Sequence, residues 1–383
     1  MQYHIVKSLT TVFVGFPLSL RLLILSAFVL TVDLNAGEVF EVPRARSAFA
    51  PSAASFDGKI FLGWRGVGTP DRVENDQELY LAFRGAEGWI RKEVSIGKSM
   101  FGPVLASNQD RLFIAWHGAG NLFSGTGDPR LYLAAISRDG LVQHLGAVPD
   151  AVSAGPPGLA VHRGLVYVGW RAGGNITVGT VPGNQHWINF NVYDPKTQSW
   201  LGEKGGGGNI VHANGTSGPT FAAAGERLYV LWRGTGSITF YGPNSDPGDP
   251  SIYYGFLTEG EWSTRQLPLP IIPGALTAWS PGAVAWHDHL LVAWRGDQQR
   301  GDTRADSSVS LAWYDGNQNW HTIDLFANSK PRSAFAPSLA VDETDENLWM
   351  FWRGEFDLES GINDQQIYAT TLSKASFETE AMP

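Results

Sequence analysis

The chain has 383 residues, of which 43% are hydrophobic and 17% charged, and this is enough apolar sequence for one large domain or two smaller ones. Its 45 glycines and 15 tryptophans, with few segments of helical periodicity, favour an all-β fold rich in turns. The formal net charge of -9 argues against a nucleic-acid partner. The absence of cysteine excludes disulfides, thiol catalysis and thiolate metal sites.

The N-terminal segment differs in composition from the rest. Lys7 and Arg21 precede an apolar run over residues 22–32, and small residues follow around Ala36. This layout predicts a signal peptide over residues 1–36, and hence a secreted or periplasmic protein that has no membrane attachment after cleavage. The apolar run of about eleven residues is short for a membrane span, and an uncleaved anchor is the alternative.

Six repeats follow the N-terminal segment. A proline precedes a tryptophan by thirteen positions in five repeats and by fifteen in the sixth. The pairs are Pro51 and Trp64, Pro103 and Trp116, Pro157 and Trp170, Pro219 and Trp232, Pro281 and Trp294, and Pro337 and Trp352. Because this register has no interruption that would mark a linker, residues 37–383 are expected to form a single domain. Its repeats cover about 47–97, 98–150, 151–210, 211–274, 275–330 and 331–383.

Each repeat has the pattern of four short strands. Before the first tryptophan, Ile60 and Leu62 alternate with Phe61, so both faces of that strand are apolar, as in a strand covered by sheets on both sides. The next strand starts three residues after an aspartate, or after Gln185 in the third repeat. An aromatic residue marks the fourth strand at Trp89, Trp200, Trp262, Trp320 and Phe377. Four antiparallel strands per repeat predict a six-bladed β-propeller.

Two segments compete to close the ring. Residues 37–45 resemble a fourth strand that leads into the first blade, whereas the spacing from Tyr368 to Phe377 matches that from Tyr80 to Trp89 and favours a fourth strand belonging to the sixth repeat. The sequence does not rank these two alternatives.

The long loops between second and third strands share one face of the predicted ring with the blade-to-blade links, and binding sites commonly lie on such loops. An arginine follows the repeat tryptophan and an aspartate precedes the third strand, at the two ends of the same loop. These could form repeated ligand pockets, but their recurrence favours a structural pair joined by a bidentate hydrogen bond in each blade. The pairs are Arg65 and Asp76, Arg233 and Asp249, Arg295 and Asp306, and Arg353 and Asp364. His117 replaces the arginine in the second repeat, and is either a ligand-binding residue or a satisfied buried histidine.

The links before blades 5, 6, 1 and 2 carry aromatic residues, and three of them also carry a cation. The sequence "RSAFAP" occurs twice, "KSMFGP" and "LTAWSP" are related, and the links of blades 3 and 4 lack both features. These four blades are adjacent in a ring, so the side chains are expected near the mouth of the central channel, where they could bind a sugar and an anionic group. The predicted ligand-binding residues are Arg46, Phe49, Lys98, Phe101, Trp279, Arg332 and Phe335. The alternative is that the aromatic rings pack between blades and the cations are solvated.

No sequence motif points to catalysis or to a cofactor. Two histidines at His287 and His289 are a weak zinc signal, and residues 244–250 could bind calcium but lack the spacing of an EF-hand. No metal and no cofactor is therefore expected. Carboxylates on the long-loop face could serve a glycoside hydrolase or lyase as acid and base, and they are Asp71, Glu74, Glu355, Asp357 and Glu359.

The repeats resemble the blades of bacterial β-propeller lectins, including fucose-binding ones, in stretches such as "SPGAVAWHDHLLVAWRG", "VSLAWYDGNQNW" and "GPTFAAAGERLYVLWRG". This resemblance implies a propeller with a secreted, glycan-binding role. Acidic glycans are included because of the clustered cations. The alternatives are the hydrolase or lyase above and a protein-interaction scaffold, and the sequence does not indicate an oligomeric state.

Overall fold

The computed structural model describes residues 38–377, apart from 68–75, 93–94, 122–125, 173–185, 203–206, 235–248, 266–269, 288, 297–306, 317–318, 324–329, 345, 358–361 and 375–376. The predicted signal peptide lies outside these residues. Within them, no helix is long and apolar enough to cross a membrane.

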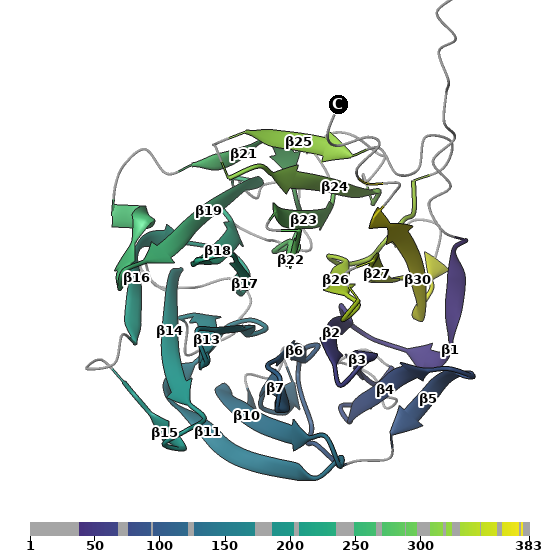
Figure 1. Cartoon of the computed structure of the whole chain (residues 1–383), viewed down its shortest axis with the longest axis horizontal. Helices are drawn as coiled ribbons and strands as arrows, with labels where there is room; N and C mark the ends of the chain where they lie inside the picture. The colour runs from purple at the N-terminus through teal and green to yellow at the C-terminus, as the bar shows by residue number, and fades with distance from the viewer. Residues whose placement is uncertain are drawn as a thin grey trace, which may run out of the picture. The chain divides into compact units, whose positions relative to one another are not determined.

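Six antiparallel sheets stand around a central axis, so the protein is an all-β, six-bladed β-propeller (Figure 1). Blade 1 consists of β2 (Ser52–Phe56), β3 (Lys59–Arg65), β4 (Leu79–Gly85) and β5 (Gly88–Lys92). Blade 2 consists of β6 (Val104–Ser107), β7 (Arg111–His117), β10 (Arg130–Ser137) and β11 (Val142–Val152). Blade 3 consists of β12 (Gly158–His162), β13 (Leu165–Arg171), β14 (Trp187–Asp194), β15 (Ser199–Trp200) and β16 (Gly208–Asn214).

The other three blades repeat this arrangement. Blade 4 consists of β17 (Thr220–Ala224), β18 (Arg227–Arg233), β19 (Ser251–Thr258), β20 (Glu261–Trp262) and β21 (Ile271–Leu276), with the 3-10 turn η2 (Ser263–Arg265). Blade 5 consists of β22 (Gly282–Trp286), β23 (His289–Arg295), β24 (Val309–Tyr314) and β25 (Trp320–Ile323). Blade 6 consists of β26 (Ser338–Val341), β27 (Asn347–Arg353), β30 (Gln366–Ser373) and β1 (Phe40–Arg46). Two short hairpins, β8 (Gly120–Asn121) with β9 (Thr126–Gly127) and β28 (Phe356–Asp357) with β29 (Ile362–Asn363), extend from the loops of blades 2 and 6.

The N-terminal strand β1 is the outer strand of blade 6. It pairs antiparallel with β30, with Phe40 opposite Ala369 and Arg46 opposite Gln366. Figure 1 shows purple β1 beside yellow β30, the two ends of the described chain. Of the two segments considered for ring closure, residues 40–46 therefore take the place of the fourth strand, and the first and last strands of the propeller belong to one sheet.

Phe377 does not lie in a fourth strand of blade 6, contrary to the spacing argument. Its buried ring packs against Trp286, with 4.9 Å between the ring centroids, and near Trp313 of the same blade. Trp89, Trp262 and Trp320 from fourth strands likewise contact the preceding blade. Phe377 therefore fills the position between blades that a fourth-strand tryptophan fills in blades 1, 4 and 5, although Phe377 itself is not in a strand.

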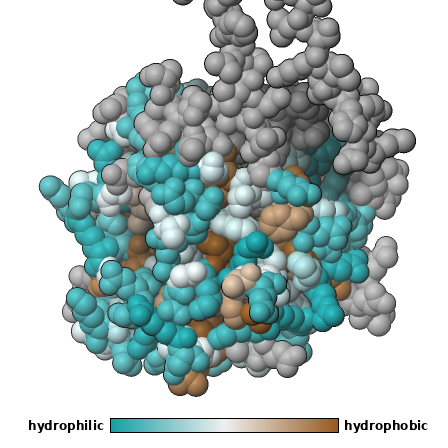
Figure 2. All heavy atoms as spheres, turned by 45° about the vertical axis from the view of Figure 1, so that its right-hand side comes forward, coloured by the Kyte–Doolittle hydropathy of each residue, from teal (hydrophilic) through white to brown (hydrophobic). Residues whose placement is uncertain are grey.

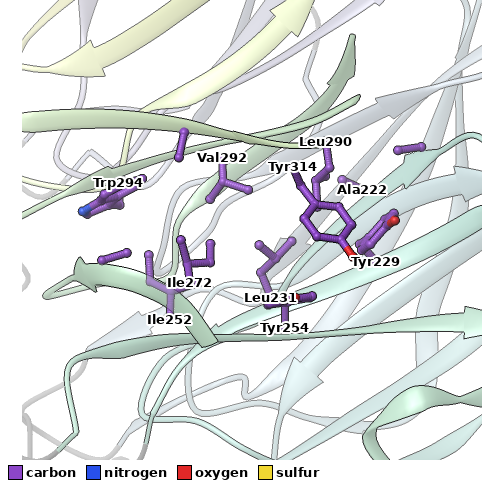
Figure 3. Packing of buried hydrophobic residues seen from close by; sticks show 13 residues of the cluster. Ala222, Tyr229, Leu231, Ile252, Tyr254, Ile272, Leu290, Val292, Trp294 and Tyr314 are labelled. Atoms are coloured by element: carbon purple, nitrogen blue, oxygen red, sulfur yellow. The ribbon is translucent and has the colours of Figure 1, made fainter. Parts of the chain in front are cut away.

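The cores lie between neighbouring blades. The alternation of apolar side chains along each second strand sends successive residues into the two adjacent interfaces, as with Leu290 and Val292 toward blade 4 and Leu291 and Ala293 toward blade 6. Figure 3 shows one interface, where Tyr314 and Val292 of blade 5 meet Tyr229 and Leu231 of blade 4. Six such clusters stabilise the ring without disulfides.

The outer strands of four blades contain a repeated backbone bulge that the sequence analysis did not identify. Arg44, Asp150, His212 and Gly274 have φ values of 59°, 58°, 63° and 69°, and the strand register shifts in each of these sheets. A β-bulge bends a strand, and here each bulge directly precedes the link that runs inward to the next blade.

The outer surface is mostly hydrophilic on the side that Figure 2 brings forward, with apolar residues scattered between polar ones. Large exposed hydrophobic side chains are few among the described residues, and Trp187, 48% exposed, is the largest of them. Scattered apolar residues of this kind are ordinary on a protein surface and indicate no docking patch.

Candidate functional site

The links between blades and the loops between second and third strands lie on one face, as predicted. Each link begins beside the third strand of the preceding blade, as Arg46 does opposite Gln366 and Lys98 does opposite Glu78. It then passes the loop of its own blade, where Ala48 N donates to Gly66 O at 3.2 Å. The chain reaches the innermost strand only after this point, so the link crosses the face from the outside inward.

The residue after each repeat tryptophan bonds to the next blade. Arg65 Nε donates to the carbonyl oxygen of Ser99 at 2.8 Å, and Arg353 Nε closes the ring by donating to Ser47 O at 2.9 Å. The same inter-blade contact recurs from Arg233 to Thr277 O, from Arg295 to Ser333 O, from Arg171 to Thr216 O and from His117 to Ser153 O. We call these six contacts the inter-blade staples.

The residues whose carbonyl oxygens accept the staple bonds have buried hydroxyl groups, and these hydroxyls hold the link in place. Ser333 Oγ donates to Arg353 O at 3.0 Å, and Thr277 Oγ1 donates to Arg295 O at the same distance. The hydroxyl of Ser47 accepts from Phe49 N. A serine or threonine in every link thus fixes the backbone that presents the aromatic side chain two residues later in four of the blades.

The repeat aspartates bind tyrosines and backbone, which differs from the expected bidentate Arg–Asp pairs. Asp364 accepts hydrogen bonds from Gln366 N at 2.9 Å and from Tyr368 Oη at 2.8 Å. Asp76 and Asp249 accept from the residues at the same two positions, and Asp306 lies outside the described residues. The arginine of each repeat bonds to the next blade, and the aspartate of the same repeat orients the start of the third strand instead.

Arginine and aspartate nevertheless interact electrostatically. Burial lowers the pKa of Arg65 to about 10, and the charge of Asp76 partly offsets this effect. Arg353 has a pKa of about 10 for the same reason, with Asp364 as its counter-charge. Both guanidinium groups therefore remain charged at neutral pH, inside the ring.

His117 has a structural role in this geometry. It is 0% exposed, its Nε2 lies 3.0 Å from Ser153 O, and its Nδ1 lies 2.8 Å from Gly118 O. Burial lowers its pKa, although the two carbonyl oxygens favour the protonated ring. His117 thus takes the place of arginine in its inter-blade staple, which favours the alternative of a satisfied buried histidine over a ligand-binding role.

Four aromatic side chains form a continuous arc across blades 5, 6, 1 and 2. Trp279 lies 5.1 Å from Phe335, Phe335 lies 5.4 Å from Phe49, and Phe49 lies 5.5 Å from Phe101 between ring centroids. All four rings are partly exposed. We call this set the aromatic arc, and the alignment of the links predicted all of its members.

Two buried staple arginines pack against rings of the aromatic arc. The guanidinium carbons of Arg65 and Arg353 lie 5.3 Å and 5.5 Å from the ring centroids of Phe49 and Phe335. A cation over an aromatic face is attracted by the electron-rich ring. The inter-blade staples therefore also fix the orientation of two rings in the arc.

The three cations of the links pair through their backbone with the third strand of the preceding blade or the residue just before it. Lys98 Nζ pairs with Glu78 at 3.2 Å, and Arg332 pairs with Glu355 at 2.8 Å. Arg46 is exposed on β1, opposite Gln366. Two of the three cations already have a carboxylate partner, and their part in ligand binding stays a prediction.

Blades 3 and 4 have small residues where the arc has rings. Gly155 stands at the position of Phe49, and its backbone packs against that of Gly218. A Cβ on Gly218 would lie 1.8 Å from Pro156 O, so only glycine fits there. Ser217 bonds to Ser280 at 2.6 Å between hydroxyl oxygens. The channel mouth is thus aromatic on one side and lined by backbone and small polar groups on the other.

The carboxylates considered for catalysis do not form a described pair. Asp71, Glu74 and Glu359 lie outside the described residues, as does the side chain of Asp357. Glu355 Oε1 is held by Arg332 Nη2 and by Ser307 Oγ. In the part of the chain that the structure describes, no three histidine or acidic residues gather as metal ligands.

No protein-family model matches the chain, and no curated protein matches it. Solved structures do match in fold. AofleA from Arthrobotrys oligospora is 12% identical with a TM-score of 0.50, over 86% of this chain and 88% of that one. The sialidase of Trypanosoma rangeli in complex with sialic acid is 10% identical with a TM-score of 0.53, over 90% of this chain and 58% of that one. The chain thus spans less than two thirds of the sialidase, and identities this low establish a shared propeller fold alone.

Proposed function

We propose that the protein binds carbohydrate on the face that carries the aromatic arc, in the manner of a lectin. The observation that carries this proposal is the continuous, partly exposed series Trp279, Phe335, Phe49 and Phe101 at the channel mouth. Aromatic faces present a large apolar area in a fixed orientation, and the C–H groups of a pyranose ring stack on such faces.

The rigid support of the arc favours binding over simple packing. Each ring is attached to a link whose hydroxyl and staple bonds are buried, as at Ser333 and Arg353. Rigid aromatic groups lose little conformational entropy when a ligand binds, so their contact area contributes more fully to affinity. Rings needed only to fill space between blades would be buried, as Phe377 is.

The fold matches are consistent with this proposal. One of the propellers that shares the fold is a sialidase seen with sialic acid, which is a sugar ligand on the same architecture. The resemblance of the repeats to β-propeller lectins points in the same direction. We propose secretion or a periplasmic location as well, on the N-terminal sequence pattern alone.

A glycan array tests the proposal, first with the wild-type protein and then with Trp279→Ala and Phe49→Ala. We expect binding to a restricted set of glycans and a loss of at least about tenfold in each variant, which corresponds to about 1.4 kcal/mol. Trp187→Ala is the matched control, because this tryptophan is exposed on the third strand of blade 3, outside the arc. Binding that survives both arc variants in folded protein would rule out the arc as the site.

A second pair of variants tests whether the link cations contribute. Arg332 is already paired with Glu355, so Arg46→Ala combined with Arg332→Ala should weaken glycan binding by less than either arc variant does. If this double variant abolished binding while the arc variants did not, the ligand would bind at the outer edge of the face.

A further inference from the structure

The arginine of blade 3 differs from the other staple residues in its surroundings. Arg65, Arg233, Arg295, Arg353 and His117 are all buried, whereas Arg171 is partly exposed. Its Nη1 makes the inter-blade staple by donating to Thr216 O at 2.8 Å. In the other four arginine staples Nε makes the contact, but the Nε of Arg171 is buried and has no hydrogen-bond partner.

Arg171 also lacks the aromatic ring that covers the arginines of blades 1 and 6, and the aspartate of the repeat. Phe49 covers Arg65, and Phe335 covers Arg353, but Gly155 stands at the corresponding position of blade 3. The repeat aspartate is replaced in the sequence by Gln185, which lies outside the described residues. Burial alone lowers the pKa of Arg171, with no carboxylate acting on it, in contrast to Arg65.

A second nitrogen without a partner belongs to a histidine near Arg171, and it is a donor in the tautomer that carries its proton on Nδ1. Arg171 is opposite Ile188 in the β13–β14 pair, so His186, two residues before Ile188, is its diagonal neighbour on one side of the sheet. The Nδ1 of His186 is buried and has no hydrogen-bond partner. Burial lowers the pKa of His186, and the nearby charge of Arg171 lowers it further.

These observations point to an anion. A buried donor without a partner costs about 1–3 kcal/mol, and more when it carries charge. Arg171 Nε and His186 Nδ1 both lack a partner, the charge of Arg171 acts on His186, and no carboxylate of the described residues acts on Arg171. The planar guanidinium fork matches the two oxygens of a carboxylate better than it matches a single oxygen.

We propose that Arg171 and His186 form a carboxylate-binding site on blade 3. It is distinct from the aromatic arc and does not depend on the proposed carbohydrate function. The carboxylate belongs either to an acidic sugar or to a free organic acid, and both present the same two oxygens to Arg171.

Isothermal titration with three small molecules tests this proposal. D-Glucuronate carries the carboxylate on a sugar, D-glucose is the neutral sugar of the same ring, and acetate is the carboxylate alone. We expect glucuronate to bind and Arg171→Gln to weaken it at least tenfold. Arg138→Gln should bind as the wild type does, because Arg138 is exposed and donates only to Gln109 O. Acetate binding as strong as that of glucuronate would identify a free acid as the ligand, whereas glucuronate binding alone would identify an acidic sugar.

Gln185→Asp provides a variant that keeps Arg171. It restores the aspartate that the repeat has in the other blades. The charge of this aspartate acts on the staple arginine in blades 1 and 6, so the added carboxylate is expected to compete with a ligand carboxylate for Arg171. Loss of glucuronate binding with an unchanged melting temperature supports the site. If wild-type protein binds neither carboxylate at millimolar concentration, or if both variants bind glucuronate normally, the proposal is wrong.

The arc variants separate this site from the proposed function. Phe49→Ala should weaken glycan binding on the array at least about tenfold and leave the carboxylate affinity within about twofold. Loss of carboxylate binding in Phe49→Ala but not in Arg171→Gln would place the carboxylate at the arc and overturn the assignment to blade 3.

Discussion

Arg353→Ala should destabilise the whole ring, because Arg353 joins blade 6 to blade 1. Its guanidinium is 3% exposed, donates through Nε to Ser47 O at 2.9 Å, and lies 5.5 Å from the ring centroid of Phe335. Truncation removes this charged hydrogen bond, leaves a buried carbonyl without its donor, and leaves the carboxylate of Asp364 without its counter-charge. Breaking a buried charged contact from one side costs about 3–5 kcal/mol.

The expected change in melting temperature follows from this cost. A folded domain of roughly 350 residues has an unfolding entropy of about 0.7 kcal/mol/K, so a loss of about 4 kcal/mol lowers the melting temperature by about 5–6 °C. Differential scanning calorimetry measures this shift directly. The matched control is Arg138→Ala, whose guanidinium also donates to a carbonyl oxygen but is exposed. It should change the free energy of unfolding by no more than about 0.5 kcal/mol.

Two results would refute the reasoning. A shift below about 1 °C for Arg353→Ala would mean that the staple contributes no more than a surface contact. Equal shifts for the two variants would mean that burial of the guanidinium does not matter. Either result would also remove the argument that the staples hold the aromatic arc rigid.

Three further predictions concern the ring. Phe377→Ala should destabilise the fold by about 3–5 kcal/mol in urea denaturation, because it opens a cavity beside Trp286. Gly218→Ala should lower the melting temperature by several degrees, because the added Cβ would lie 1.8 Å from Pro156 O and the backbone of two blades would have to separate. Burial holds the pKa of His117 below its ordinary value of 6.5, so the unfolded chain takes up the proton first and stability falls as the pH drops through about 6.5. His117→Arg should remove this part of the pH dependence, which melting curves from pH 8 to pH 5 would show as a shallower slope.

The sequence predicted the architecture because the repeat residues are also the core residues. Trp64 and its five equivalents fix the second strand, and the alternation before each of them determines which side chains enter which inter-blade cluster. The spacing argument singled out Phe377 as the aromatic residue of blade 6. That argument assigned Phe377 to a fourth strand, because periodicity cannot distinguish a strand residue from a side chain that reaches the same inter-blade position from a turn.

The site was predicted only in part, and the reason is the kind of partner involved. Phe49, Phe101, Trp279 and Phe335 contact one another through their own side chains, so aligning the links was sufficient to find them. The acceptors of the staple bonds are backbone carbonyl oxygens, which every residue has, so the sequence does not show which of them accepts. Lys98 pairs with Glu78 because its link begins beside the third strand of the preceding blade. This pairing between neighbouring blades depends on closure of the ring, and an alignment of the repeats does not show it.

Departures from the repeat have different meanings, and the structure separates them. Blade 2 replaces arginine by His117 yet keeps the inter-blade staple, the burial and the aromatic neighbour Phe101, so the change is structural. Blade 3 keeps Arg171 yet loses the aromatic cover, the repeat aspartate and the Nε contact together. A single loss could be accommodated by repacking, but three losses around one charge leave Arg171 Nε without a hydrogen-bond partner, which is the basis of the proposed carboxylate site. Blade 3 is therefore where a ligand specific to this protein should be sought, and the aromatic arc is where a sugar should be.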